Sequence, residues 1–569
     1  MIKQQTIIKK FLGLNQCGDE SSNGSYSSYM MNFRITDKFE LKKRDGFKTV
    51  AQHSAPIRAM WCGEINGVKQ IVYVSNGVVY SFNTTTETST QCGQIEDGVT
   101  NMFSFGGMLY IQNSVNYYKY DGTSISAVEG YIPIIAISSM PSGGGTPYET
   151  INMLTDKRRQ LFSSDFNERK YELAEKNLTS IIKVTVNGKQ TNQYEYDLVE
   201  GYIEFFTPQP TGLNNIEVTY SKTHTLRDRI VKCSHSMLFG SNADTRVFLW
   251  GNPELPSYRF HSELADGVPS AEYFPELNYT SIGTSSITDI VQQYDRQLIF
   301  TPDSAYYSYC DVRTDSAGKA YSSFPVFSLN SSKGNLISAS GCDINGRPVT
   351  LCRDGINIWE STSIENEKNA VCFSSPICNA IYNIQSSDDW NNCRLFDFQS
   401  SNELYFTHNN IMYIYNYRLG VWYAYDGINA DVFCDCYGEL YIAGKDNKIY
   451  KYDSTLNNHT AVWKSNGMDF SEPCRKKDIS SVILTALVTP ATELTVSCSE
   501  GEERNSMIFT QTLALPYTNT SYLAARKMRI GMRRINTVYI TITCDTGKSL
   551  TLKNLSIITQ KKGDAEYGI

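Results

Sequence analysis

One β-hairpin pattern recurs along this chain, and it constrains the fold more than any other feature. Each copy has an apolar triplet, a turn rich in Asn, Asp, Gly or Ser, and then a strand with aromatic residues two positions apart. A period of two places side chains on one face of a sheet, and these turn residues tolerate the left-handed backbone of tight hairpins. The seven copies span residues 71–83, 109–121, 238–252, 298–311, 349–361, 404–416 and 440–453.

The spacing of the copies predicts a closed repeat fold. Most neighbouring copies lie roughly 35 to 60 residues apart, which is typical of four-stranded propeller blades. Residues 393–398 and 420–426 add two strands around the sixth copy and complete a four-stranded unit. We therefore predict an all-β chain that contains a β-propeller of about seven blades, with the seven hairpins at equivalent places in successive blades. An N-terminal strand near residues 47–50 is expected to close it. An array of β-sandwiches is the alternative.

The regions outside the repeat divide the rest of the chain. A Gly/Pro/Ser-rich stretch at 138–149 opens a gap in the repeat, and at least four short strands follow it. After residue 461 the strands lengthen. We expect an N-terminal extended segment and closing strand at 1–50, the propeller at 51–137 and 229–460, an inserted β-domain at 138–228, and a C-terminal β-sandwich at 461–569.

Composition and charge narrow the class of protein. The 38 Tyr and 25 Phe favour pleated strands, and the net charge of −7 argues against a general nucleic-acid binder. The N-terminus has no signal-peptide pattern, and no apolar run is long enough to span a membrane. We expect a soluble protein made in the cytosol, whose 15 Cys are mostly reduced and buried, Cys434 and Cys436 included.

The sequence predicts no enzyme, metal site or cofactor. None of the six His lies at ligand spacing from another, and no Cys-x-x-Cys pair exists. Residues 352–359 faintly resemble the Asp-box turn of sialidases, which are propeller enzymes. The spacing from Asp354 to Trp359 is one residue short, however, and the motif occurs once. A propeller glycosidase and a non-enzymatic receptor-binding, lectin-like propeller are the alternatives to a structural role.

The N-terminal stretch carries a family resemblance. Residues 11–50 contain a Gly-Leu-Asn triplet and a Met-Asn-Phe triplet, followed by a Leu and an Arg-x-Gly. The matching positions are Gly13, Leu14, Asn15, Met31, Asn32, Phe33, Leu41, Arg44 and Gly46. This form resembles the opening of bacteriophage tail nozzle proteins, also called packaged-DNA stabilisation or tail tubular B-type proteins. We interpret Arg44-Asp45-Gly46 as a turn that closes a strand pair rather than as a partner contact.

The resemblance implies a virion protein of the tail that is assembled in the host cytoplasm. Six copies would form a ring below the portal and adaptor, hold packaged DNA in place and conduct it during ejection. Residues 461–569 carry 14 Lys/Arg and 10 Asp/Glu, so their net charge is +4 and that of the remaining chain is −11. Because cations on a tube wall add affinity for DNA, an acidic body permits passage.

One basic stretch is the candidate interface or channel site. It contains Arg526, Lys527, Arg529, Arg533 and Arg534. Two interpretations compete for these residues: they line the channel and touch DNA, or they pair with acidic surface on a neighbouring subunit or the adaptor. The second is favoured, because cations bound to the wall would slow the exit of DNA.

Overall fold

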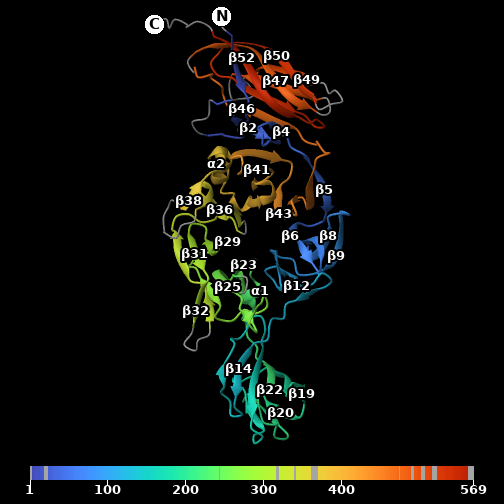
Figure 1. Cartoon of the computed structure of the whole chain (residues 1–569), viewed down its shortest axis with the longest axis vertical. Coiled ribbons are helices and arrows are strands. Elements are labelled where there is room, and N and C mark those ends of the chain that lie inside the picture. The colour runs from blue at the N-terminus through green and yellow to red at the C-terminus, as the bar shows by residue number, and fades with distance from the viewer. Residues whose placement is uncertain are drawn as a thin grey trace.

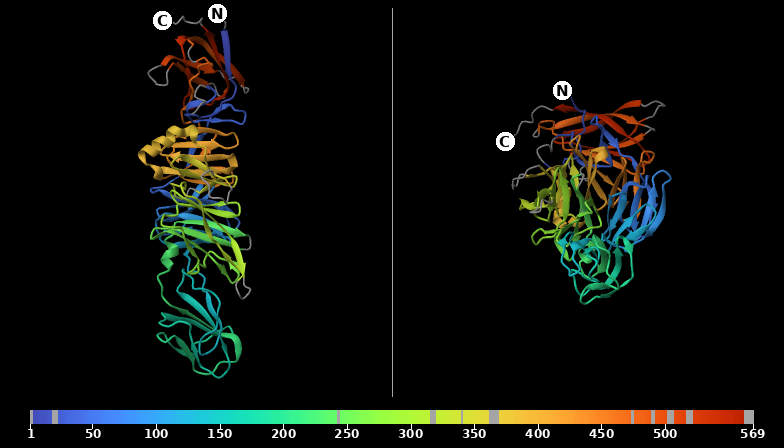
Figure 2. Two further views of the ribbon diagram at one scale, coloured as in Figure 1. Left: turned by 90° about the vertical axis from the view of Figure 1, so that its left-hand side faces the viewer. Right: turned by 60° about the horizontal axis from the view of Figure 1, so that its bottom comes forward.

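The computed structural model describes residues 3–17, 23–241, 244–314, 320–338, 341–360, 369–472, 475–488, 492–500, 507–515 and 522–561. Within them the chain is all-β, with many small, mostly antiparallel sheets. The described helices are α1 (Arg227–Val231), α2 (Cys378–Ser387), η3 (Ser375–Ile377), η4 (Trp390–Asn392) and η5 (Gln399–Ser401), and none is long and apolar enough to cross a membrane. Three parts follow one another along the long axis (Figure 1), and the edge view in Figure 2 shows one narrow column.

Seven four-stranded antiparallel sheets form the middle part, as counted over the described residues. The first four are β6 (Ile57–Ile65), β7 (Val68–Ser75), β8 (Val78–Asn83) and β9 (Thr88–Gln94); β10 (Asn101–Phe105), β11 (Met108–Gln112), β12 (Tyr117–Tyr120) and β13 (Ile125–Ala127); β23 (His235–Ser241), β24 (Asp244–Asn252), β25 (Leu255–His261) and β28 (Tyr279–Ser281); and β29 (Asp289–Gln293), β30 (Arg296–Phe300), β31 (Ala305–Tyr309) and β34 (Val326–Asn330). Two side hairpins, β26 (Leu264–Ala265) with β27 (Val268–Pro269) and β32 (Asp311–Thr314) with β33 (Ala320–Ser323), extend from this region.

The other three sheets complete the set. They are β35 (Cys342–Ile344), β36 (Arg347–Cys352), β37 (Gly355–Trp359) and β38 (Ala370–Cys372); β39 (Cys393–Phe398), β40 (Glu403–His408), β41 (Ile411–Asn416) and β42 (Val421–Asp426); and β43 (Ala430–Cys436), β44 (Glu439–Gly444), β45 (Lys448–Asp453) and β5 (Gly46–Gln52). The first strand of each sheet contacts the first strand of the next, and β43 of the seventh sheet contacts β6 of the first. The seven sheets therefore form a closed circuit, which we call the ring.

The repeated hairpins occupy two different places in these sheets. Six of them form the second and third strands of their sheet, as β44 and β45 do. The third, at 238–252, instead forms the first and second strands, β23 and β24. The pattern of apolar triplet, polar turn and aromatic strand identifies an antiparallel pair, but it carries no information on where that pair lies within a sheet. The prediction of seven equivalent hairpins was wrong at this copy.

Strand β5 completes the seventh sheet. It pairs antiparallel with β45, from Gly46 opposite Asp453 to Gln52 opposite Lys448. A disulfide between Cys62 of β6 and Cys436 of β43 joins the first and last sheets at the same seam. The expectation that Cys436 is a reduced, buried thiol was therefore wrong, because the closed ring places these two distant cysteines on touching strands. Cys434 is free and buried, as expected.

A second disulfide ties the N-terminal segment to the ring. Cys17 is bonded to Cys378, which begins helix α2 between the fifth and sixth sheets. Among the described residues ten other cysteines are free. The expectation of mostly reduced cysteines agrees with these ten, and both disulfides join positions that are far apart in the chain.

The part at one end of the ring lies between the second and third sheets in the chain. One sheet contains β15 (Thr146–Pro147), β14 (Ile134–Ser139), β16 (Lys157–Ser164), β22 (Gly212–Ser221), β18 (Ser180–Val186) and β19 (Lys189–Gln190), and the other contains β17 (Lys170–Glu172), β21 (Tyr202–Phe205) and β20 (Tyr194–Asp197). The β18–β19 turn uses Asn187 and Gly188 with positive φ, as an Asn-Gly hairpin requires. We call residues 134–221 the insert.

The insert is not continuous in the fold, because the chain packs against the ring once between β15 and β16. Met153 and Leu154, between β15 and β16, are buried in the same core cluster as Val247 and Phe260 of the third sheet. The backbone N–H of Met153 donates to the carbonyl of Phe274 at 2.8 Å. The chain thus returns to the ring core before it enters β16, which the domain range 138–228 did not anticipate.

The part at the other end combines both ends of the chain. One sheet holds β3 (Phe33–Ile35), β4 (Leu41–Lys43), β52 (Thr551–Lys561), β47 (Lys477–Val488) and β50 (Tyr522–Ile535), with β1 (Lys3–Ile8) beside β52. The other holds β2 (Ser27–Met31), β46 (Ala461–Ser465), β51 (Tyr539–Cys544), β48 (Thr492–Ser499) and β49 (Met507–Leu515). One buried cluster contains residues of both sheets and of the sixth ring sheet. We call these two sheets the terminal unit; the segment expected at 1–50 supplies four of its strands.

The residues of the N-terminal motif form the joint between the terminal unit and the ring. Asn32 Nδ2 donates to Asp426 Oδ1 at 2.7 Å, and Arg44 Nε donates to Asn32 Oδ1 at 2.8 Å. The Arg44 side chain also donates to the carbonyl of Asp426 at 3.0 Å, and Arg44 is 3% exposed. Gly13 has a φ of +79°, and a Cβ there would overlap the carbonyl oxygen of Trp422.

The interpretation of Arg44-Asp45-Gly46 was right about its structural role and wrong about its geometry. The three residues connect β4 of the terminal unit to β5 of the seventh ring sheet, and these two strands do not pair. Arg44 is buried, and its guanidinium donors bond to Asn32, Asp45 and Asp426 of its own chain, so they are not free to contact a partner.

The seam disulfide yields a stability prediction. Cys62→Ser should lower the free energy of unfolding by roughly 2–5 kcal/mol without reductant, because the cross-link between the first and last sheets is lost. Thermal midpoints of the purified chains measure this effect. Cys92→Ser is the control, because Cys92 is free and half-buried. A Cys62→Ser chain as stable as the wild type, or a wild-type chain in which non-reducing peptide maps find Cys62 and Cys436 free, would contradict the prediction.

Candidate functional site

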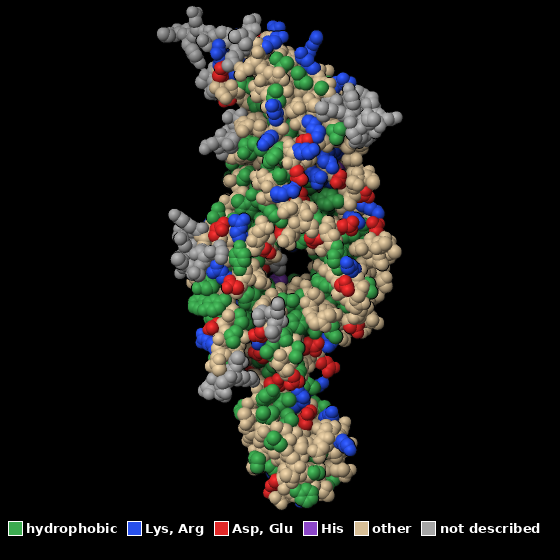
Figure 3. Space-filling model, in the orientation of Figure 1, with side chains coloured by type: hydrophobic (Ala, Val, Ile, Leu, Met, Phe, Trp, Pro, Cys, Tyr) green, Lys and Arg blue, Asp and Glu red, His purple; other side chains and the backbone are tan. Residues whose placement is uncertain are grey.

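The ring surrounds an opening that is visible in Figure 3. A cavity of about 620 Å³ occupies one mouth of it, where the first strands of the sheets begin. Its lining includes Arg58, Asn101, His235, Arg394, Asp431 and Phe433. Pockets of about 300–1,000 Å³ take small ligands. This cavity is therefore of small-molecule size.

The charges at this mouth neutralise one another. Arg58 binds Asp97 through two hydrogen bonds of 3.1 and 2.6 Å, and Arg394 lies 2.8 Å from Asp431. The hydrogen bond from Arg58 lowers the pKa of Asp97. Burial lowers the pKa of His235 to about 4, so its ring is neutral at pH 7. Neither Asp97 nor His235 is therefore poised for proton transfer near neutral pH.

Carboxylates from three neighbouring sheets face one another at the other end of the first strands. Burial, and then the charge of Asp343, raises the pKa of Asp397 to about 7, and Asp435 adds to the shift. Asp343 accepts from the backbone of Gly346 at 2.7 Å, and Asp435 accepts from Gly438 at 3.0 Å. Asp343 and Asp435 therefore stabilise the turns that follow their strands.

The sequence analysis missed this cluster. Its signal was readable as Asp followed three positions later by Gly, at 343–346 and 435–438. In the structure Asn345-Gly346 and Tyr437-Gly438 have positive φ, as two-residue type I′ hairpin loops require, and the Asp before each loop accepts from the backbone N–H of its Gly. Only the ring, however, brings the three strands together. Within the described residues no group of three His, Cys, Asp or Glu is arranged to hold a metal ion.

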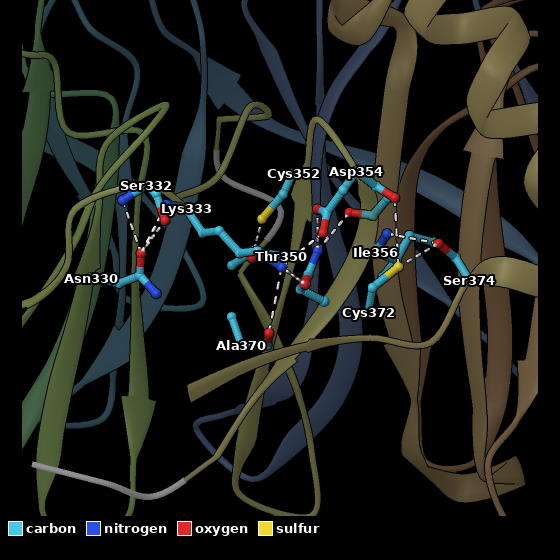
Figure 4. Close-up of polar contacts among 12 residues, drawn as sticks. Asn330, Ser332, Lys333, Thr350, Cys352, Asp354, Ile356, Ala370, Cys372 and Ser374 are labelled. Atoms are coloured by element: carbon cyan, nitrogen blue, oxygen red, sulfur yellow. Dashed lines mark hydrogen bonds and ion pairs between the residues drawn. The ribbon is translucent and has the colours of Figure 1, made fainter. Parts of the chain in front are cut away.

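The sialidase-like motif has a structural role (Figure 4). Lys333 Nζ lies 2.7 Å from Asp354 Oδ2 and 2.9 Å from Asn357 Oδ1. Trp359 is fully buried and donates its Nε1–H to Thr350 Oγ1 at 2.8 Å. The motif thus fixes the turn between β36 and β37 and its link to the fourth sheet.

The predicted basic residues lie together on β50 of the terminal unit. All five side chains are exposed, and Met528, Ile530 and Met532 alternate with them and are buried. Alternation places Lys527, Arg529 and Arg533 on the outward face of the sheet. No ion pair joins any of the five to another described residue. Figure 3 shows Lys and Arg side chains gathered over this end of the molecule.

An acidic surface lies near the insert, toward the other end. A pocket of about 580 Å³ is lined by Glu149, Asp244, Glu263 and Asp266, and Arg246 is the single cation among its lining residues. Exposed apolar side chains line it as well: Tyr148 (45% exposed), Val312 (65%) and Tyr321 (49%). Exposed apolar groups beside unbalanced charge are typical of interaction surfaces. We call these residues the acidic pocket.

Comparisons with known proteins define neither a family nor a function. No protein-family model and no curated protein matches the chain. The computationally designed Ika8 protein aligns at 9% identity over 71% of this chain and 98% of its own, with a TM-score of 0.31. A Mitotic Checkpoint Complex chain aligns at 10% over 74% and 93%, with a TM-score of 0.34. The exo-β-1,3-galactanase of Phanerochaete chrysosporium aligns at 9% over 86% and 100%, with a TM-score of 0.18.

The carboxylate cluster generates a prediction on pH dependence. The pKa of Asp397 is raised in the folded chain. Its favourable contribution to the free energy of unfolding is therefore present at low pH and is lost as pH rises from about 4 to about 7. Asp397→Asn removes this loss and should be more stable than the wild type at pH 8 by roughly 1–3 kcal/mol, after a discount for partial solvent exposure.

Thermal midpoints at pH 4 and pH 8 measure the effect. The gap between Asp397→Asn and the wild type should open only at the higher pH. The exposed Asp295, in the turn between β29 and β30, provides the control variant Asp295→Asn. A gap that is the same at both pH values would show that Asp397 ionises normally in the folded chain.

Proposed function

We propose that the ring is a seven-bladed β-propeller and that the terminal unit is a β-sandwich. Each ring sheet is a four-stranded antiparallel unit, and the first strands contact one another around a closed circuit. The last sheet takes its outer strand, β5, from the other end of the ring sequence. Closing the circuit in this way removes the open edges that stacked sheets would otherwise leave.

We infer that the chain is a structural subunit of a bacteriophage tail, of the nozzle type, and not an enzyme. The observation that carries this proposal is the position of the two appended units, which extend from opposite ends of the ring (Figures 1 and 2). Ring sheets bury their faces against each other, whereas appended β-units have free surfaces and edges for neighbours. The N-terminal resemblance to the nozzle family supports the same reading.

In this proposal several copies, six by the family resemblance, assemble below the portal and adaptor. DNA then passes between the copies and not through the opening of any one ring, whose cavity is about 620 Å³. The basic residues of β50 on one copy face acidic surface on the next. The acidic pocket, with its exposed apolar side chains, is the described surface best suited to meet them.

A glycosidase is the second candidate, and Asp397 is the observation that favours it. A carboxyl whose pKa is about 7 suits a general acid, and two further carboxylates lie near it. Against this, Asp343 and Asp435 are occupied as turn acceptors. The structural proposal therefore remains the stronger one.

The location of the protein on its particle tests the structural proposal. A tagged chain, labelled with gold and imaged on the virion, should mark the tail axis next to the portal. Label at the periphery of the tail would favour a receptor-binding propeller. Hydrolysis of a glycan by the purified chain, abolished by Asp397→Asn, would favour the glycosidase.

Charge reversal on β50 should impair assembly. Arg533→Glu with Arg534→Glu replaces attraction to an acidic neighbour by repulsion, which is strongest at low salt. Light scattering of the purified chain should then show smaller assemblies at low salt, with an unchanged thermal midpoint. Arg353→Glu with Lys69→Glu is the matched control, since both side chains are exposed and belong to ring sheets rather than to the terminal unit. Variant particles that assemble fully but leak DNA would support the channel interpretation instead.

Removal of most of the insert should also block assembly. Lys157 and Ser221 are cross-strand partners, so residues 158–220 can be replaced by an Asn-Gly turn that joins them. Met153 and Leu154 remain in the ring core. The shortened chain should keep the thermal transition of the ring and fail to join the tail. Normal assembly of this variant would show that the insert is not an assembly element.

A further inference from the structure

A third cavity, of about 240 Å³, lies where the N-terminal segment crosses the sixth and seventh ring sheets. Arg34, Arg44 and Asp45 of the N-terminal segment line one side. Glu403, Tyr405 and Tyr425 of the sixth sheet and Lys451 and Tyr452 of the seventh line the rest. We call this cavity the joint pocket. It is separate from the ring opening and from the acidic pocket.

Most charged groups of the joint pocket are already satisfied. The guanidinium of Arg44 donates to Asn32, to the carbonyl of Asp45 and to the carbonyl of Asp426. Lys451 Nζ lies 2.9 Å from Glu439 Oε2. Arg44 holds the joint together, Lys451 is paired within the seventh sheet, and both have little capacity for a ligand.

The buried carboxylate of Glu403 is satisfied as well. Tyr405 donates its hydroxyl to Glu403 Oε2 at 3.0 Å, and Tyr423 donates to Oε1. Burial raises the pKa of Glu403, and these two donors oppose the shift. With both oxygens occupied, Glu403 is part of the wall of the pocket.

Arg34 and Asp45 are the exceptions. The side chains of both line the pocket, and neither makes a hydrogen bond or an ion pair with another described side chain. The charge of Glu403 and, more weakly, the charge of Asp45 act on the Arg34 guanidinium without a hydrogen bond or an ion pair to it. An arginine fork that lies half-buried with its donors unused suits a planar carboxylate, which it can bind through two parallel hydrogen bonds.

The remaining walls specify the rest of the ligand. Tyr405, Tyr425 and Tyr452 contribute aromatic surface, and Leu440 and Phe398 add apolar surface. The cavity is smaller than pockets for drug-sized ligands, which start at about 300 Å³. The unpaired charges are one guanidinium and one carboxylate, so a ligand that carries one of each sign complements them, whereas a polyanion does not.

We propose that the joint pocket binds a free amino acid, whose carboxylate pairs with Arg34 and whose ammonium group pairs with Asp45. The tyrosine rings surround its side chain, and an aromatic side chain fits them best. A bound ligand contacts the N-terminal segment and both ring sheets at once. It therefore stabilises the closed joint in proportion to its concentration.

Titration calorimetry of the full chain tests this proposal with three probes. L-Phenylalanine carries both charges, N-acetyl-L-phenylalanine lacks the ammonium group, and L-phenylalaninamide lacks the carboxylate. L-Phenylalanine should bind, and each of the other two should bind about tenfold more weakly or worse, because each leaves one buried charge unpaired. Equal binding of all three, or no binding of L-phenylalanine at millimolar concentration, would overturn the proposal.

Variants of this chain assign the two charges. Arg34→Gln should weaken the binding of L-phenylalanine about tenfold and leave the binding of L-phenylalaninamide unchanged. Asp45→Asn should also weaken the binding of L-phenylalanine about tenfold, but leave the binding of N-acetyl-L-phenylalanine unchanged. Arg418→Gln is the control, since Arg418 pairs with Asp37 on the surface outside this pocket. Unchanged affinity in Arg34→Gln would overturn the assignment.

A second measurement covers a variant that fails to fold. Crystals of the unmodified chain, soaked in L-phenylalanine, should show the ligand within hydrogen-bond distance of Arg34. An empty joint pocket in those crystals would overturn the proposal whatever the variants do.

Discussion

The pairing of β5 with β45 is the constraint on which the rest of the structure depends. Without β5 the seventh sheet would have three strands, and β45 would be its open outer edge. Because β5 lies at 46–52, its pairing with β45 also fixes the point at which the residues before 46 leave the ring. They cross directly into the terminal unit through Arg44 and Asn32, so that closing the ring and docking the terminal unit are coupled.

This coupling packs the ring and the base of the terminal unit into one core. The outer surfaces of the terminal unit and the insert remain available for contacts with neighbours. The joint is made by buried groups, and one core cluster continues from the sixth ring sheet into the terminal unit. The insert is held at its base by Met153 and Leu154, which return to the ring core. The unpaired basic residues of β50 and the acidic pocket lie outside these packed regions. A subunit with such ends suits an assembly in which neighbours meet through appended units.

The sequence predicted the local elements well and their long-range relations only in part. Tight hairpins follow from turn residues and from period-two patterns, which are local, and the closing strand follows from the need to cover an edge. Position within a sheet is not local, which is why the hairpin at 238–252 was assigned to the wrong place. The bond between Cys62 and Cys436 and the cluster around Asp397 depend on strands that meet only in the folded ring. The exposure of the basic residues was readable from their alternation with Met528 and Ile530.

The most direct test of the account is cryo-electron microscopy of the purified protein over a range of concentrations. The account predicts closed rings of copies in which the terminal units and inserts make the contacts, the seven-sheet ring of each copy stays intact, and an axial passage lies between the copies. Particles that remain single copies at all concentrations, or rings whose contacts are made by the faces of the seven-sheet circuit with the two ends free, would contradict it.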